Sequence, residues 1–139
     1  MKKPQFLTGS EAAMMISDNS TVATIGMTLV SASETILKAI ENRFLTEGHP
    51  NGLTLVHSCG QSDRDRGIQH FAHEGMLRRI IGGHWGLQPK MMELISQNKI
   101  LAYCIPQGQF AQLYRSMAGG EPGKITKVGL GTFILQQRF

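Results

Sequence analysis

Thr21-Val22-Ala23-Thr24-Ile25-Gly26 is the stretch that decides the fold. Its short, apolar and β-branched composition predicts a strand, and the glycine marks the point where the strand ends. After this turn, apolar residues recur with the spacing of one face of an α-helix. One face of the predicted helix carries Ile36, Leu37, Ile40 and Phe44. A strand that leads through a glycine turn into an amphipathic helix is typical of α/β proteins.

The same alternation continues on both sides of this unit. Thr8 and Glu11 have the spacing of a capping box, and Ser31 or Ser33 is expected to cap the helix after Gly26. Helices are predicted at residues 12–16, 87–97 and 107–117, with a helical turn at 71–77. Strands are predicted at residues 53–58, 78–81, 100–104 and 124–129. We therefore expect an open, mainly parallel α/β sheet with helices on both faces, forming a single partial domain across residues 1–139.

The composition is that of a globular protein. Hydrophobic residues make up 41% of the 139 residues and charged residues 17%, which argues against intrinsic disorder. No apolar run reaches the roughly 18 residues that a membrane span needs. The N-terminal lysines are followed by no apolar signal region. Cys59 and Cys104 lie far apart in no metal-type pair, so free thiols in a reducing cytoplasm are expected.

The net charge of +4 permits several kinds of anionic partner. The one tight cluster of charges, Asp63-Arg64-Asp65-Arg66, is nearly self-neutralising. No basic helix face and no interleaving of basic and aromatic residues is present, so nucleic-acid binding is not expected. The positive charge is compatible with a phosphate-bearing small molecule as ligand, and it is equally compatible with a protein that binds no ligand.

Ligands of open α/β sheets bind outside the carboxyl ends of the strands, so the turns that follow the strands matter most. Gly26-Met27-Thr28 opens the first of these turns, where free backbone N–H groups can hold an oxyanion or a phosphate. Pro106-Gln107-Gly108 opens another, where Gln107 can meet a ligand amide or carboxylate. Each turn also fits an ordinary connection between a strand and a helix.

Three further features carry a chemical and a structural interpretation. His70 and His73 have a spacing that allows a shared metal, but no third ligand has a recognisable spacing, so local hydrogen bonds are preferred. Glu74 precedes a glycine, but nothing marks it as an activated nucleophile. In Gly82-Gly83-His84-Trp85-Gly86 the glycines imply close backbone approach, and Trp85 either stacks on a cofactor or packs in a turn.

Several short motifs occur together in one order along the chain. They are Asn42-Arg43-Phe44 through Gly48-His49-Pro50, Arg66-Gly67, His70-Phe71-Ala72-His73-Glu74-Gly75, Gly83-His84-Trp85-Gly86, Pro106-Gln107-Gly108, Pro122-Gly123 and Gly129-Leu130-Gly131-Thr132-Phe133. In these motifs the chain resembles the N-terminal part of the family I CoA-transferases, in particular the fused propionate/acetate CoA-transferases. The match extends from about residue 11 to residue 133.

This resemblance implies a fold with one open α/β domain in each half of the enzyme, and a ping-pong transfer of CoA between carboxylates. A glutamate in the second half attacks the acyl-CoA and then carries CoA as a thioester. The first half is expected to bind acyl-CoA and the carboxylate through Gly26, Met27, Thr28, Gln107 and Gly108. CoA or acyl-CoA is a substrate, and no bound cofactor and no metal is expected. The resemblance also implies a second CoA-transferase half or a homo-oligomer as partner, and no nucleic acid or membrane.

The chain departs from the family pattern in three respects. Leu29 and Ser33 stand where the family's first loop has a glycine and a proline. The nucleophile's turn, Glu-Asn-Gly or Glu-Ser-Gly, is absent, since Glu41-Asn42 is followed by Arg43. After Gly131-Thr132-Phe133 the family continues with an Asp-Pro-Arg segment, which this sequence lacks. We therefore expect no catalytic residue here, which makes the chain an inactive N-terminal fragment. The alternatives are a subunit that needs a glutamate-bearing partner, or a non-catalytic CoA-binding module; a lone half should also self-associate.

Overall fold

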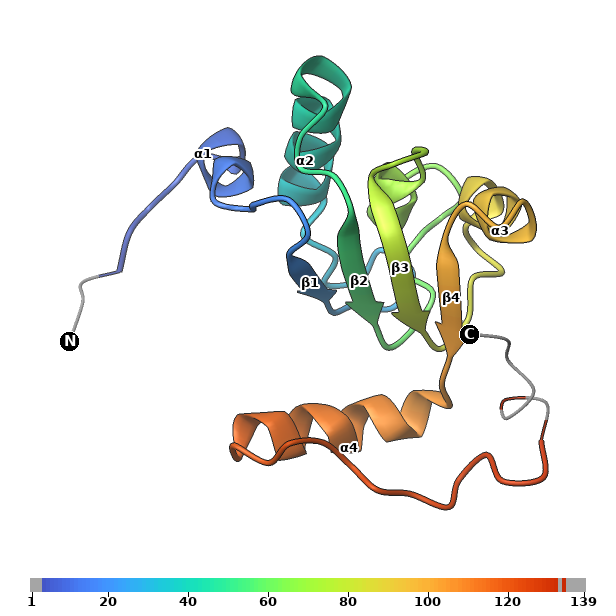
Figure 1. Ribbon diagram of the computed structural model, residues 1–139. Coiled ribbons are helices and arrows are strands. Elements are labelled where there is room, and N and C mark those ends of the chain that lie inside the picture. Colours follow the sequence, from blue (N-terminus) through green and yellow to red (C-terminus); the bar gives the residue numbers. More distant parts are fainter. Residues whose placement is uncertain (1–3, 133, 135–139) are drawn as a thin grey trace.

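The computed structural model describes residues 4–132 and 134. Four parallel strands form one open sheet in the spatial order β1-β2-β3-β4. They are β1 (Thr21–Thr24), β2 (Leu53–His57), β3 (Leu77–Gly82) and β4 (Leu101–Cys104). All four point toward the same end of the molecule (Figure 1). The open parallel α/β class predicted from the sequence is confirmed.

The helices alternate with these strands. They are α1 (Gly9–Met14), α2 (Glu34–Glu47), the 3-10 helix η1 (Gly67–Phe71), α3 (Pro89–Ser96) and α4 (Gln107–Ala118). Because α2 and α3 both contact η1, these three helices form one layer over the sheet. α4 lies apart from them, below the carboxyl ends of the strands (Figure 1). No helix in the described part of the chain is long and apolar enough to cross a membrane.

The core lies between the sheet and the layer of α2, η1 and α3. Strand residues alternate between the two faces of a sheet, so neighbouring positions on adjacent strands form rows across it. The row that faces the helices is Val22, Leu55, Ile80 and Ala102. Leu55 and Ile80 in this row are fully buried, and Val22 and Ala102 pack against the same core.

The opposite face of the sheet is more open. Its corresponding row is Ala23, Val56, Ile81 and Tyr103. Ala23 is exposed, and the other three residues are only partly buried. Parallel sheets usually have both faces covered. This second face is therefore a surface on which further structure can pack.

The structure corrects two of the expected elements. The strand predicted at residues 124–129 does not form, and Ile125 is fully exposed, because the segment has no single apolar face to bury and pairs with no described strand. The helical turn expected at 71–77 lies earlier, in η1. Gly67 has a φ of 72°, which lets the chain turn into this helix, and the buried Phe71 ends it.

The predicted helix ends are mostly as expected. The capping box of α1 forms, since the Thr8 hydroxyl accepts from the Glu11 amide and the Glu11 carboxylate accepts from the Thr8 amide. Pro89 lies in the first turn of α3, and α4 ends before Gly119. Ser33 occupies the N-cap position of α2, but its side chain makes no capping hydrogen bond.

Candidate functional site

A hollow at the carboxyl ends of the strands is the candidate site. It has a volume of about 500 Å³. The residues that line it are Ile25, Ser58, Gln107, Gly108, Ala111 and Tyr114. A hollow of similar size, about 530 Å³, lies between α1 and α2, away from the carboxyl ends. We place the site at the carboxyl edge because ligands of open α/β sheets bind there.

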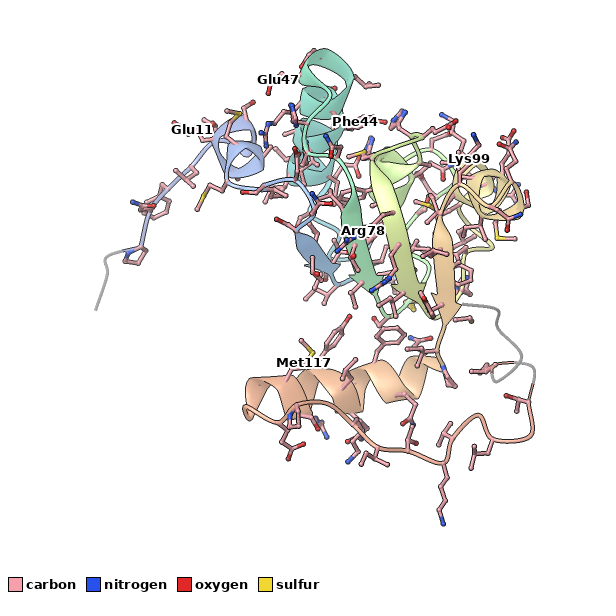
Figure 2. The ribbon with its side chains drawn as sticks, in the orientation of Figure 1. Glu11, Phe44, Glu47, Arg78, Lys99 and Met117 are labelled. Carbon is pink, nitrogen blue, oxygen red and sulfur yellow. The ribbon has the colours of Figure 1, made fainter. Side chains whose placement is uncertain are left out.

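α4 supplies most of the lining. The chain turns at Pro106, the N-cap residue of α4, which places Gln107 and Gly108 in the first turn below the sheet. The buried Phe110 holds α4 against the rest of the molecule, and Met117 lies on the side of α4 that faces the strands (Figure 2). A Cβ at Gly108 would meet no atom within 4 Å. Packing within the described chain therefore does not require this glycine, and its backbone is open to a ligand.

The Gly26 loop, residues 26–33, follows directly after Ile25, which lines the same hollow. Gly26 has a φ of 141°, and a Cβ there would lie 2.8 Å from the Val30 carbonyl oxygen, so the loop requires glycine for its own packing. The amide of Met27 donates to Val30 O at 3.1 Å, and the amide of Thr28 donates to Gly60 O at 2.8 Å. These two amides would have to leave those acceptors before they could bind a ligand oxyanion.

The structure thus brings Gln107 and Gly108 to the hollow, whereas Gly26, Met27 and Thr28 follow Ile25 in the chain and are not among the residues that line it. Ser58, Ala111 and Tyr114 also line the hollow, and the sequence interpretation missed them. Burial raises the pKa of the Tyr114 hydroxyl, which has no hydrogen-bond partner among the described residues. Gln107, Ala111 and Tyr114 are spaced i, i+4 and i+7, a spacing that places them on one face of a helix, so the sequence did contain a signal that Ala111 and Tyr114 lie on the same side of α4 as Gln107.

The two histidines predicted to form local hydrogen bonds instead bind carboxylates of α2. His70 Nε2 donates to Glu34 Oε1 at 2.7 Å, and His70 Nδ1 donates to Glu41 Oε2 at 2.5 Å. His73 Nε2 donates to Glu41 Oε1 at 2.7 Å. In the described part of the chain, no group of three or more His, Cys, Asp or Glu residues is arranged to hold a metal ion. We call Glu34, Glu41, His70 and His73 the carboxylate–imidazole cluster.

The hydrogen bonds of this cluster lower the pKa of its two glutamates. Burial acts to raise the pKa of Glu34, but hydrogen bonds from His70 and Gly67 outweigh it and leave the pKa below its ordinary value. Burial acts in the same direction on Glu41, and hydrogen bonds from His73 and His70 again lower the pKa. Both glutamates are therefore carboxylates at neutral pH.

The remaining candidates have structural roles in the described chain. Glu74 is exposed and pairs with Lys99 at 2.7 Å, which is not the setting of an activated nucleophile. Trp85 packs against the hydrophobic core, which favours the packing interpretation. The close approach expected of the glycines occurs within the chain, since a Cβ at Gly82 would overlap the imidazole of His57.

No family model matches this chain. Over 131 residues it is 38% identical to the caffeate CoA-transferase of Acetobacterium woodii, a match that covers 94% of this chain and 25% of that protein. Over 130 residues it is 36% identical to the acetate CoA-transferase YdiF of Escherichia coli strain K12, covering 92% of this chain and 24% of that protein. The chain thus spans about a quarter of the length of the curated relatives that it matches.

Solved structures agree with these relatives. The acyl-CoA transferase YdiF of Escherichia coli O157:H7, in a thioester complex with CoA, superposes with a TM-score of 0.85 at 36% identity over 92% of this chain and 27% of that chain. The apoenzyme of the same protein superposes with a TM-score of 0.87 at 34% identity, over 96% of this chain and 28% of that chain. A variant of the decarboxylase AibA/AibB, at 20% identity and a TM-score of 0.67, shows a similar fold alone. The resemblance stated from the sequence is confirmed.

Proposed function

We propose that this chain, which is homologous to CoA-transferases over nearly its whole length, is an N-terminal fragment or subunit of an acyl-CoA:carboxylate CoA-transferase of the acetate/propionate type. The observation that carries the proposal is the match over 92% of the chain to an acyl-CoA transferase solved as a CoA thioester. CoA or acyl-CoA enters this proposal as a substrate, and the second substrate is a small carboxylate.

The proposed ligand site is the hollow at the carboxyl edge of the sheet. Gln107 and Gly108 line it directly, and Gly26 follows Ile25 at its border. Gln107 presents an amide that can donate to a thioester or carboxylate oxygen and accept from an amide N–H of the CoA chain. Gly108 leaves its backbone open to close approach. Met27 and Thr28 contribute amides if the loop opens in the presence of ligand.

The described chain supplies binding groups in this proposal, but no nucleophile. The sequence contains no Glu-Asn-Gly or Glu-Ser-Gly turn of the kind that carries the family's glutamate. Without that carboxylate no glutamyl–CoA thioester forms, so the chain alone is inactive. A second chain that bears the glutamate would complete the site, and the open sheet face of Ala23, Val56 and Ile81 favours such a partner over a free-standing binding module.

A transfer assay tests this proposal. The purified chain is incubated with acetyl-CoA and propionate, and propionyl-CoA is measured by mass spectrometry. We expect no propionyl-CoA from the chain alone. We expect its formation when the glutamate-bearing second half of a CoA-transferase is added and binds. Turnover by the chain alone would show that the nucleophile has been wrongly assigned to another polypeptide.

A further inference from the structure

The carboxylate–imidazole cluster is more extensively bonded than an ordinary ion pair. Each ring nitrogen of His70 faces a different glutamate, Glu34 at 2.7 Å and Glu41 at 2.5 Å. The His70 side chain is only 10% exposed, and that of Glu41 only 20%. Because a carboxylate only accepts hydrogen bonds, both nitrogens donate and the ring bridges two negative charges. Buried ion pairs are a weak source of stability, so their geometry is a better guide to what this cluster does.

The cluster lies where the Gly26 loop enters α2. Glu34 is the first residue of α2. Its Oε1 accepts from His70, and its Oε2 accepts from the amide of Gly67 at 2.9 Å. Glu41 lies about two turns further along the same helix and holds the other side of the imidazole. The first turn of α2 is thereby attached to η1 through both oxygens of one side chain.

The other part of the loop is attached to the same region of the chain. The Thr28 amide donates to Gly60 O at 2.8 Å, and the next residue, Gln61, accepts from the amide of Ile68 at 2.8 Å. The segment from Gly60 to His70 therefore holds the loop at its middle and at its exit. The middle contact is a single neutral hydrogen bond, whereas at the exit the Glu34 carboxylate accepts two charge-assisted hydrogen bonds, one from His70 and one from the amide of Gly67, which are the stronger kind.

We propose that His70 is a positioning residue, which bridges Glu34 and Glu41 and so fixes the Gly26 loop, residues 26–33, against η1 beside the ligand hollow. His70 does not border the hollow itself. It acts through Glu34, whose backbone continues directly from the loop. The effect on the loop is independent of any ligand, whereas its consequence for CoA binding rests on the proposed function.

Hydrogen–deuterium exchange of the intact chain separates loop positioning from overall stability. Met27, Thr28, Val30 and Ala32 donate backbone hydrogen bonds within the loop region, so their exchange reports whether the loop stays ordered. For His70→Ala we expect this exchange to accelerate by about 10-fold or more, since bonds between charged groups are lost. Amides of β2 should change much less. His49→Ala, which removes an exposed pair with Asp18 at 2.8 Å, is the matched control and should leave the loop unchanged.

Free imidazole provides a second readout that a general loss of packing would not show. Imidazole should enter the space left in His70→Ala, bridge the two carboxylates and restore slow exchange of the loop. If His70→Ala does not fold, Glu34→Gln keeps the side-chain volume, removes one charge and should loosen the same amides. Unchanged loop exchange in the folded variant, or equal acceleration in β2 and the loop, would overturn the proposal.

A titration with CoA distinguishes this inference from the proposed function. If the wild-type chain binds CoA, His70→Ala should weaken binding by about 10-fold, while His49→Ala should not. Binding that is unchanged in a variant with a loosened loop would refute the link between the loop and the ligand. If the wild-type chain does not bind CoA, the proposed function fails, and the exchange of the loop amides still decides whether His70 positions the loop.

Discussion

Lowering the pH from 7 to 4 should destabilise this fold through His57, at the end of β2. The side chain is fully buried, and its Nδ1 donates to the Cys59 carbonyl at 2.7 Å. Nε2 has no hydrogen-bond partner among the described residues and lies against Gly82. Burial lowers the pKa of His57 to about 4; the hydrogen bond to Cys59 opposes this change, and the nearby His84 adds to it. A proton on Nε2 would therefore place a charge where nothing can solvate it.

The sign and size of the effect follow from the two pKa values. His57 has an ordinary pKa of 6.5 and a folded pKa of about 4. Between these values the unfolded chain binds a proton that the folded chain does not, so the free energy of unfolding falls as the pH falls from 6.5 to 4. At about 1.4 kcal/mol for each pH unit, the loss from this residue is about 3 kcal/mol. Below pH 4 it should level off.

Urea unfolding at pH 7, 6, 5 and 4 measures this loss. His57→Asn retains a donor for the Cys59 carbonyl but cannot titrate, and His49→Asn controls for an exposed histidine. Carboxylates such as Glu34 contribute to the pH dependence of every variant, so the difference between wild type and His57→Asn isolates the imidazole. We expect the wild type to lose about 3 kcal/mol more than His57→Asn over this range. Identical pH profiles would refute the reasoning.

Three further predictions concern packing and surface. Gly82→Ala should destabilise the fold by about 1–3 kcal/mol, because its Cβ would overlap the buried His57 ring. The control is Gly86→Ala, whose Cβ would make only an ordinary van der Waals contact with His84, and equal stabilities of the two variants in urea unfolding would contradict this prediction. Arg43→Ala should lower the free energy of unfolding by about 1.5–3 kcal/mol, because Arg43 Nη1 donates to the Ala13 and Ile16 carbonyls at the end of α1. Glu47→Ala removes only the exposed ion pair with Arg43 and should lower it by about 0.5 kcal/mol or less, so a larger loss in Glu47→Ala than in Arg43→Ala would be inconsistent with the structure. The exposed apolar side chains of Ile25, Met27 and Val30, together with the open sheet face, should cause concentration-dependent association in sedimentation velocity, and a strictly monomeric profile would exclude it.

The features predicted correctly from the sequence are those that short segments encode. The capping box of Thr8 and Glu11 depends on residues three apart, and both of its hydrogen bonds form. Strands β1 to β4 are apolar runs next to helical periods, and their alternation was sufficient to predict a parallel sheet. The segment at residues 124–129 contains β-branched residues, but they give it no single apolar face. A strand also needs a neighbour to pair with, and local sequence does not contain that information.

The features that were missed depend on contacts between distant segments. His70 and His73 were expected to form local hydrogen bonds, whereas their partners Glu34 and Glu41 lie 29 to 36 residues away on another helix. The acceptor of the Thr28 amide, Gly60 O, belongs to the turn after the neighbouring strand. Tyr114 reaches the hollow only because α4 lies below the sheet. Each of these contacts follows from the order of the strands and the placement of helices, which a local pattern does not fix.

Calorimetric titration of the chain with CoA is the most direct test of a CoA site at the carboxyl edge. We expect the wild type to bind CoA and Gln107→Ala to bind it roughly 2- to 10-fold more weakly, which corresponds to one hydrogen bond. Gln112→Ala, on an exposed position of the same helix that does not line the hollow, should bind as the wild type does. A flat titration of the wild type at millimolar CoA, or equal losses in the two variants, would contradict the account.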